Sequence, residues 1–190
     1  MDKKEIVITS ASRTAVGSLN RSLKNVPGFE LGSAVITDSL KKSKLKPHEV
    51  DEVIMGQVLT GGAGQNPARQ ALVHSGVPIE KPAYVVNQVC GSGIRSVASG
   101  FQSILSGDTK IVIAGGQESM SLAPHAIHLR DGKKLGDTDL TDTMIKDGLW
   151  DAFNGYHMGI TAENVAEKFN ISREEQDLFA LDSQLKTENS

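Results

Sequence analysis

The sequence predicts an α/β fold in which helices cover a mostly parallel sheet. Short apolar runs rich in β-branched residues alternate with segments of helical periodicity. Strands that alternate with helices form βαβ units, whose strands pair in parallel and whose helices lie on the faces of the sheet. The expected strands are 6–9, 53–55, 84–86 and 110–114, and the expected helices are 31–40, 67–76, 92–106, 161–168 and a last one from 173.

Local signals support the elements of the first part of the chain. The run Ile6-Val7-Ile8-Thr9 is dominated by β-branched residues, which favours a strand. Basic residues at 41, 42 and 44 suit the negative end of the helix that precedes them. Asn66-Pro67 supplies an N-cap and a proline at the first helical position, and Gly107 is placed to end the helix over 92–106.

The pattern changes after Met120. Residues 121–160 hold few periodic segments, and such long excursions usually serve a function or are disordered. Order resumes with a helix near 161–168, and Ser172-Arg173-Glu174-Glu175 is a capping box that begins a last helix. This helix reaches Ser190 without a glycine or proline stop signal, so we expect the chain to be cut from a longer protein.

Composition excludes several classes of protein. The 190 residues carry 20 basic and 23 acidic side chains, a formal net charge of -3, which provides no basic surface for nucleic acid or an anionic membrane. One cysteine excludes an internal disulfide framework. We expect no membrane span, because no apolar run approaches roughly 18 residues. The N-terminus has no secretory or transit signal, so we expect a cytoplasmic protein.

The single cysteine, Cys90, lies where a predicted strand meets a predicted helix. That helix has one apolar face and one face of small residues, so we expect it to be buried inside the protein. The N-terminus of a helix favours an anion, and this favours a reactive thiolate at Cys90. Gly91 and Gly93 leave room for a substrate carbonyl, whose oxyanion the Cys90 N–H could help to bind.

A buried, unreactive cysteine is an equal alternative on position alone, because free cysteine often behaves as a small hydrophobe. Two other nucleophile motifs are excluded. The papain signature needs Cys-Gly-Ser-Cys-Trp, but Gly93 and Ile94 occupy its last two places. The G-x-S-x-G turn of the α/β-hydrolases is absent, since cysteine occupies the junction.

Several motifs in order resemble those of the thiolases. Asn87-Gln88-Val89-Cys90-Gly91-Ser92-Gly93 looks like the family's acyl-accepting cysteine motif. Further matching segments are Ser12-Arg13-Thr14, 64–70, 115–121 and 156–166, so the likeness covers the whole chain and is closest to the biosynthetic acetyl-CoA acetyltransferase branch. Together these motifs favour Cys90 as the nucleophile.

The resemblance implies a fold and a reaction. It implies a thiolase-type mixed sheet with a buried central helix and helices on both faces, made by residues 1–120, and part of an inserted loop domain that covers coenzyme A, made by 121–190. The catalytic residue would be Cys90, which takes an acetyl group from acetyl-CoA before condensation with a second acetyl-CoA to acetoacetyl-CoA. Leu149, His157 and Met158 align with substrate-binding contacts to the pantetheine arm and thioester.

The resemblance also implies partners and a role. It implies coenzyme A thioesters as substrates, no cofactor, lipid metabolism and a homotetramer built as a dimer of dimers. Family members carry a catalytic histidine and a second cysteine in a C-terminal half, which this chain, with one cysteine, would lack. We therefore expect the isolated chain not to turn over.

Alternative functions are a degradative 3-ketoacyl-CoA thiolase and a non-catalytic module that binds acyl-CoA or a partner subunit. The intact Cys90 motif favours an enzyme. No metal site is expected: His125 and His128 form an H-x-x-H without further ligands, and the acidic run 137–142 lacks the glycine and glutamate of a calcium loop.

Overall fold

A three-stranded parallel sheet organises the first part of the computed structural model, which describes residues 5–189. Its strands are β1 (Glu52–Gly56), β2 (Ala83–Val86) and β3 (Val112–Gly116), in the order β2-β1-β3. Met55 lies opposite Val85 on one side and Gly115 on the other. Three of the four predicted strands are thus confirmed, and their carboxyl ends share one edge of the sheet.

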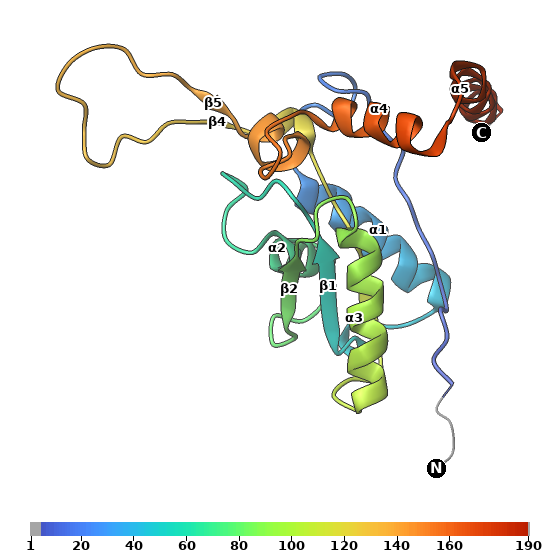
Figure 1. Cartoon of the computed structure of the whole chain (residues 1–190). Coiled ribbons are helices and arrows are strands. Elements are labelled where there is room, and N and C mark those ends of the chain that lie inside the picture. Colours follow the sequence, from blue (N-terminus) through green and yellow to red (C-terminus); the bar gives the residue numbers. More distant parts are fainter. Residues whose placement is uncertain (1–4, 190) are drawn as a thin grey trace. The chain divides into compact units, whose positions relative to one another are not determined.

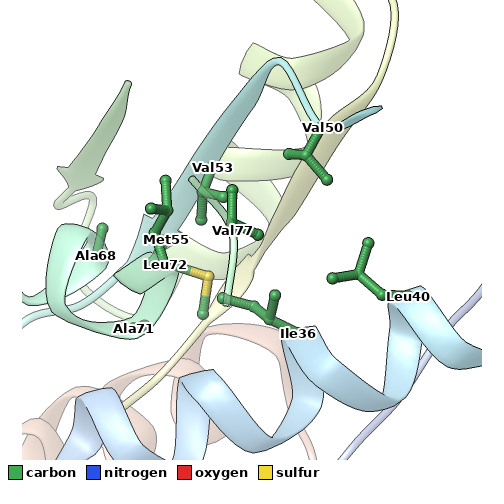
Figure 2. Close-up of a cluster of buried hydrophobic side chains, with 9 residues drawn as sticks. All are labelled: Ile36, Leu40, Val50, Val53, Met55, Ala68, Ala71, Leu72 and Val77. Carbon is green, nitrogen blue, oxygen red and sulfur yellow. The ribbon is translucent and has the colours of Figure 1, made fainter. Parts of the chain in front are cut away.

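Helices cover both faces of this sheet. On one face, α2 (Pro67–His74) packs on β1 and β2, and α1 (Gly28–Ser43) packs on α2. Figure 2 shows the buried cluster between them, made by Ile36, Leu40, Val50, Val53, Met55, Ala68, Ala71, Leu72 and Val77. Successive side chains of a strand point to opposite faces, so Ile54, which is also fully buried, points to the other face of the sheet. On that face α3 (Ser92–Ser106) packs on β1 and β3. The α/β fold with helices on both faces is confirmed.

The predicted helix ends are also confirmed. The Asn66 side chain accepts a hydrogen bond from the Arg69 N–H at the start of α2. Gly107 ends α3 in the left-handed region at φ 90°, as a glycine can at low cost. Ser172 and Glu175 form both bonds of the capping box that begins α5 (Arg173–Glu188).

The remaining elements are shorter. They are the 3₁₀ helices η1 (Pro47–Glu49) and η2 (Met120–Leu122), the antiparallel pair β4 (His125–Ala126) and β5 (Thr141–Asp142), the π-helix η3 (Met144–Leu149) and the helix α4 (Met158–Phe169). Figure 1 labels most of the helices and strands along the chain. The chain divides into two compact units between Gly148 and Leu149. The expected boundary at residue 120 stays a prediction. None of the described helices combines the length and apolar content that a membrane span requires.

The predicted strand at 6–9 is wrong. The segment has no strand pairing within residues 5–189, and Val7 and Ile8 are 64% and 81% exposed. An apolar hollow lined by Ile6–Ser10, Val97 and Ile113 lies between this segment and β3. β-Branched residues favour a strand only where a neighbouring backbone supplies hydrogen bonds, and no strand pairs with this segment within residues 5–189.

The predicted central helix, α3, is covered on one face only within residues 5–189. The small residues of α3 face the sheet: a Cβ built on Gly100 would lie 3.1 Å from Cγ1 of Val112. The apolar face points outward, with Ile94 75%, Phe101 49% and Leu105 55% exposed. A helix is buried on both sides only if a layer covers each side, and within residues 5–189 the sheet covers one side of α3 only. The expected mixed sheet is likewise not seen, because all three strands of the described sheet are parallel.

Asp51 joins β1 to β3 at the amino ends of the two strands. Its carboxylate accepts hydrogen bonds from the N–H groups of Lys110 at 2.8 Å and Ile111 at 3.0 Å. The Lys81 ammonium lies 3.7 Å away. The two backbone donors, and then the lysine charge, lower the pKa of Asp51 from its ordinary value of 3.8.

We therefore expect Asp51→Asn to reduce the pH dependence of unfolding on the acid side. Because the folded-state pKa lies below 3.8, the carboxylate contributes stability above that pH and loses it as the pH falls through the folded pKa. The variant should be less stable than wild type at neutral pH, and the difference should shrink in acid. Urea unfolding followed by circular dichroism measures this, with the exposed Asp139→Asn as control. An unchanged difference at both pH values would contradict the assignment.

Candidate active site

Cys90 lies at the carboxyl edge of the sheet, between the end of β2 and the start of α3. It is exposed, and it precedes Ser92, the first residue of the helix, by two positions. The thiol is therefore accessible and close to the positive end of the α3 dipole. Both features match the requirements for a nucleophilic cysteine, and neither a sealed pocket nor a disulfide partner removes it from reaction within residues 5–189.

A tight, strained turn carries Cys90. The Gly91 N–H donates to the Gln88 carbonyl and the Ser92 N–H to the Val89 carbonyl, each at 3.0 Å. Val89 adopts φ 48°, in the left-handed region that β-branched residues rarely occupy. Such a conformation costs about 1–3 kcal/mol and persists only where neighbouring contacts hold it.

Two polar side chains hold this turn. The Asn87 Oδ1 accepts the Val89 N–H at 2.9 Å. The Ser92 hydroxyl accepts the Gln88 N–H at 2.8 Å and lies 2.6 Å from the Val89 carbonyl, to which it donates. Ser92 is buried, so these bonds are shielded from water.

The first turn of α3 packs directly on the backbone at the end of β1. A Cβ built on Gly56 would lie 2.4 Å from the Ser92 carbonyl carbon and 2.6 Å from the Gly93 nitrogen. Only glycine permits this approach. The hydroxyl of Ser96, which is fully buried, lies 2.6 Å from the Gly93 carbonyl and 2.7 Å from the Gly115 carbonyl of β3, and can donate to either.

Glu118 joins the carboxyl ends of β3 and β1. Its carboxylate accepts the Val58 N–H at 2.8 Å and the Leu59 N–H at 3.3 Å. Burial raises the pKa of Glu118, and these backbone donors oppose that rise. The Val58 carbonyl in turn accepts a hydrogen bond from the Asn87 Nδ2 at 3.4 Å.

The expected substrate-binding residues lie in the second unit. Leu149 begins that unit, and the backbone of Trp150 pairs with that of His157. His157 is exposed and caps α4, its Nδ1 accepting the Gly159 N–H at 3.1 Å. Met158 lines an apolar groove between α4 and α5. The three residues therefore belong to one unit, and Cys90 belongs to the other.

The two segments considered and rejected as metal sites, the H-x-x-H of 125–128 and the acidic run 137–142, carry no ligand cluster in the described residues. Within residues 5–189, no three His, Cys, Asp or Glu side chains are grouped so that they could hold a metal ion. The Nε2 atom of His125 lies 3.9 Å from the Asp142 carboxylate across the β4–β5 pair. These two residues, one from each motif, are therefore in cross-strand contact.

Sequence reasoning missed the supporting residues of the Cys90 turn. It assigned no role to Gly56, Asn87 or Glu118, although Gly56 and Asn87 directly follow predicted strands and Glu118 lies four residues beyond one. The carboxyl ends of parallel strands meet at one edge, and this is where ligands bind in open α/β sheets. That rule could have singled out Asn87 and Glu118, whereas the close approach at Gly56 depends on the position of α3.

Comparison with known proteins identifies relatives over nearly the whole chain. Residues 6–190 match the family described as "Thiolase, N-terminal domain". The chain is 60% identical over 188 residues to the acetyl-CoA acetyltransferase of Rhizobium meliloti, covering 99% of this chain and 48% of that protein. It is 53% identical over 185 residues to the cytosolic acetyl-CoA acetyltransferase of Rattus norvegicus, covering 97% and 47%. The chain thus spans about half the length of these relatives.

We expect Gly56→Ala to destabilise the chain by about 1–3 kcal/mol, because the new methyl group would force α3 away from β1. The matched control is Gly93→Ala on the facing helix turn, where a Cβ would meet no atom within 4 Å. Alanine there should stabilise α3 by up to about 1 kcal/mol. Urea unfolding of both variants measures the two effects. Equal stability of the two variants would contradict the close packing.

Proposed function

Because the chain belongs to the thiolase family, we propose that it carries the acyl-accepting nucleophile of an acetyl-CoA acetyltransferase, and that this nucleophile is Cys90. One observation supports the proposal above all: an exposed thiol held by a strained turn at the start of α3. A strained, well-anchored turn fixes a reactive side chain at little cost in entropy during reaction.

The proposed first step is acyl transfer to sulfur. The Cys90 thiolate attacks the carbonyl carbon of acetyl-CoA, a carbon–sulfur bond forms, and the bond to coenzyme A breaks so that its sulfur leaves with the electron pair. A second acetyl-CoA then loses an α-proton, and its carbanion attacks the acetyl group to give acetoacetyl-CoA and free Cys90. Thiolysis is the reverse. The covalent intermediate divides a difficult carbon–carbon bond formation into two easier steps.

Two features of the second unit support a role for its residues in substrate binding. We propose that Leu149, His157 and Met158 contact the pantetheine arm and the thioester of the substrate. The apolar groove beside Met158 and the exposed imidazole of His157 suit a chain that is apolar along its stem and carries amides. The reaction needs coenzyme A thioesters as substrates and no further cofactor.

We further propose a homotetramer that acts in lipid metabolism in the cytoplasm. The name of the rat relative, a cytosolic enzyme, supports this location. The names of the relatives also favour acetyl-CoA over the longer substrates of a degradative thiolase. The intact Cys90 motif favours catalysis over a binding module without activity.

We expect acetyl-CoA to add one acetyl group to wild-type protein and none to Cys90→Ser. The thioester should be released by hydroxylamine at neutral pH, whereas an acetyl-lysine amide would remain. Intact-mass analysis before and after hydroxylamine measures both. Acetyl uptake that is independent of Cys90 would refute the assignment.

The 190-residue chain by itself should stop at this stage. Condensation needs a base that removes the α-proton, and the chain has no second cysteine to supply the acid/base group that the family resemblance implies. We expect acetylated Cys90 without acetoacetyl-CoA, measured by mass spectrometry of the protein and chromatography of the products. Sustained acetoacetyl-CoA formation by the chain alone would show that its own residues suffice.

His157 can be tested separately from the helix that it caps. His157→Asn retains a side-chain acceptor for the start of α4, whereas His157→Ala removes it at a cost of about 0.5–2 kcal/mol. If the imidazole contacts substrate, both variants should raise the KM for acetyl-CoA, but only the alanine variant should lower stability. Steady-state kinetics of the complete protein and thermal unfolding distinguish these effects. An unchanged KM in His157→Asn would contradict the substrate contact.

A further inference from the structure

Glu118 is connected to the Cys90 turn through the loop that follows β1. We propose that Glu118 is a positioning residue for Cys90, and that it acts through Val58 and Asn87. This inference rests on the proposed role of Cys90 as nucleophile. Glu118 itself lies after the end of β3, and its proposed role needs no contact with substrate.

The first link fixes the loop after β1. The half-buried Glu118 carboxylate accepts two successive N–H groups, those of Val58 and Leu59. Hydrogen bonds to a charged acceptor are roughly twice as strong as neutral ones, and partial burial limits competition from water. Gln57 adds to the same loop by donating its Nε2 to the Leu59 carbonyl at 3.1 Å. The position of the Val58 carbonyl is thereby fixed.

The second link runs from this carbonyl to the strained residue. Asn87 uses both ends of its amide: Nδ2 donates to the Val58 carbonyl, and Oδ1 accepts the Val89 N–H. The Val58 contact therefore orients the amide so that its oxygen holds Val89 at φ 48°. Since Val89 immediately precedes Cys90, a change in this turn moves the sulfur. Misplacement of a reacting group by about 1 Å can cost on the order of a hundredfold in rate.

Asp51 provides a matched comparison within the same pair of strands. It too is a half-buried carboxylate that accepts two successive backbone N–H groups, but at the amino ends of β1 and β3. Cys90 lies at the carboxyl ends. Loss of either carboxylate should loosen the strand pair, and only loss of Glu118 should affect the Cys90 turn.

The experiment compares Glu118→Gln, Asn87→Ser and their double variant with Asp51→Asn in the complete protein. The glutamine retains the size of Glu118 but offers one acceptor oxygen instead of two. Serine at 87 retains an acceptor for the Val89 N–H and is too short to reach Val58. The readouts are the single-turnover rate of Cys90 acetylation by acetyl-CoA and the midpoint of thermal unfolding.

We expect Glu118→Gln and Asn87→Ser each to slow acetylation about tenfold, and the double variant to be no slower than the slower single variant, because both act through one chain of contacts. Asp51→Asn should lower the unfolding midpoint and leave acetylation unchanged. Removal of a negative charge at Glu118 would by electrostatics favour the thiolate, so a slower rate cannot come from charge alone.

Two results would overturn the inference: wild-type acetylation rates in Glu118→Gln, or a loss of rate in Asp51→Asn as large as in Glu118→Gln at equal loss of stability. If Glu118→Gln does not fold, Asn87→Ser carries the test, because it cuts the same link at its other end. Failure of the proposed function is a separate outcome, since wild-type protein would then not acetylate Cys90.

Discussion

The contact on which the candidate site depends is the backbone approach between Gly56 and the first turn of α3. A side chain at Gly56 would overlap Ser92 and Gly93, so the absence of a Cβ sets how closely the helix sits on the sheet. The small residues along α3 continue this approach, and Ser96 completes it with a buried hydroxyl between helix and strand. Because Cys90 is two residues from the helix start, the same contact fixes the height of the thiol above the strand ends.

Parallel strands β1 and β3 are tied at both ends by carboxylates. Asp51 binds the N–H groups that precede β3, and Glu118 binds those that follow β1. The surroundings of the two acids differ: hydrogen bonds dominate at Asp51 and lower its pKa, whereas burial dominates at Glu118 and raises its pKa. Two half-buried carboxylates thus join the same pair of strands, and desolvation has the larger effect at Glu118, at the end of the sheet that carries the thiol.

Elements whose signals are local could be predicted from the sequence. The Asn66 cap, the Gly107 stop and the Ser172 capping box each depend on residues within one turn of the helix end, and all were confirmed. The strand at 6–9 and the burial of α3 were not, because each depends on a surface beyond its own segment. A β-branched run needs a partner backbone, and an apolar helix face needs a covering layer. The position of Cys90 was predictable from its neighbours, whereas the contacts of Asn87 and Glu118 required the order of the strands.

Cys90 lies in a loop, and contacts from all three strands support this loop and the helix that follows it. Each strand contributes one support at its carboxyl end: Gly56 of β1 carries the helix start, Asn87 after β2 holds the strained turn, and the Gly115 carbonyl of β3 lies within reach of Ser96. Three supports from three paired strands cannot shift independently, since the ladder fixes their spacing. The strain at Val89 is therefore balanced by the whole sheet edge and not by the loop alone. The turn that carries the proposed nucleophile therefore needs little reorganisation before reaction, which is the property that acyl transfer demands.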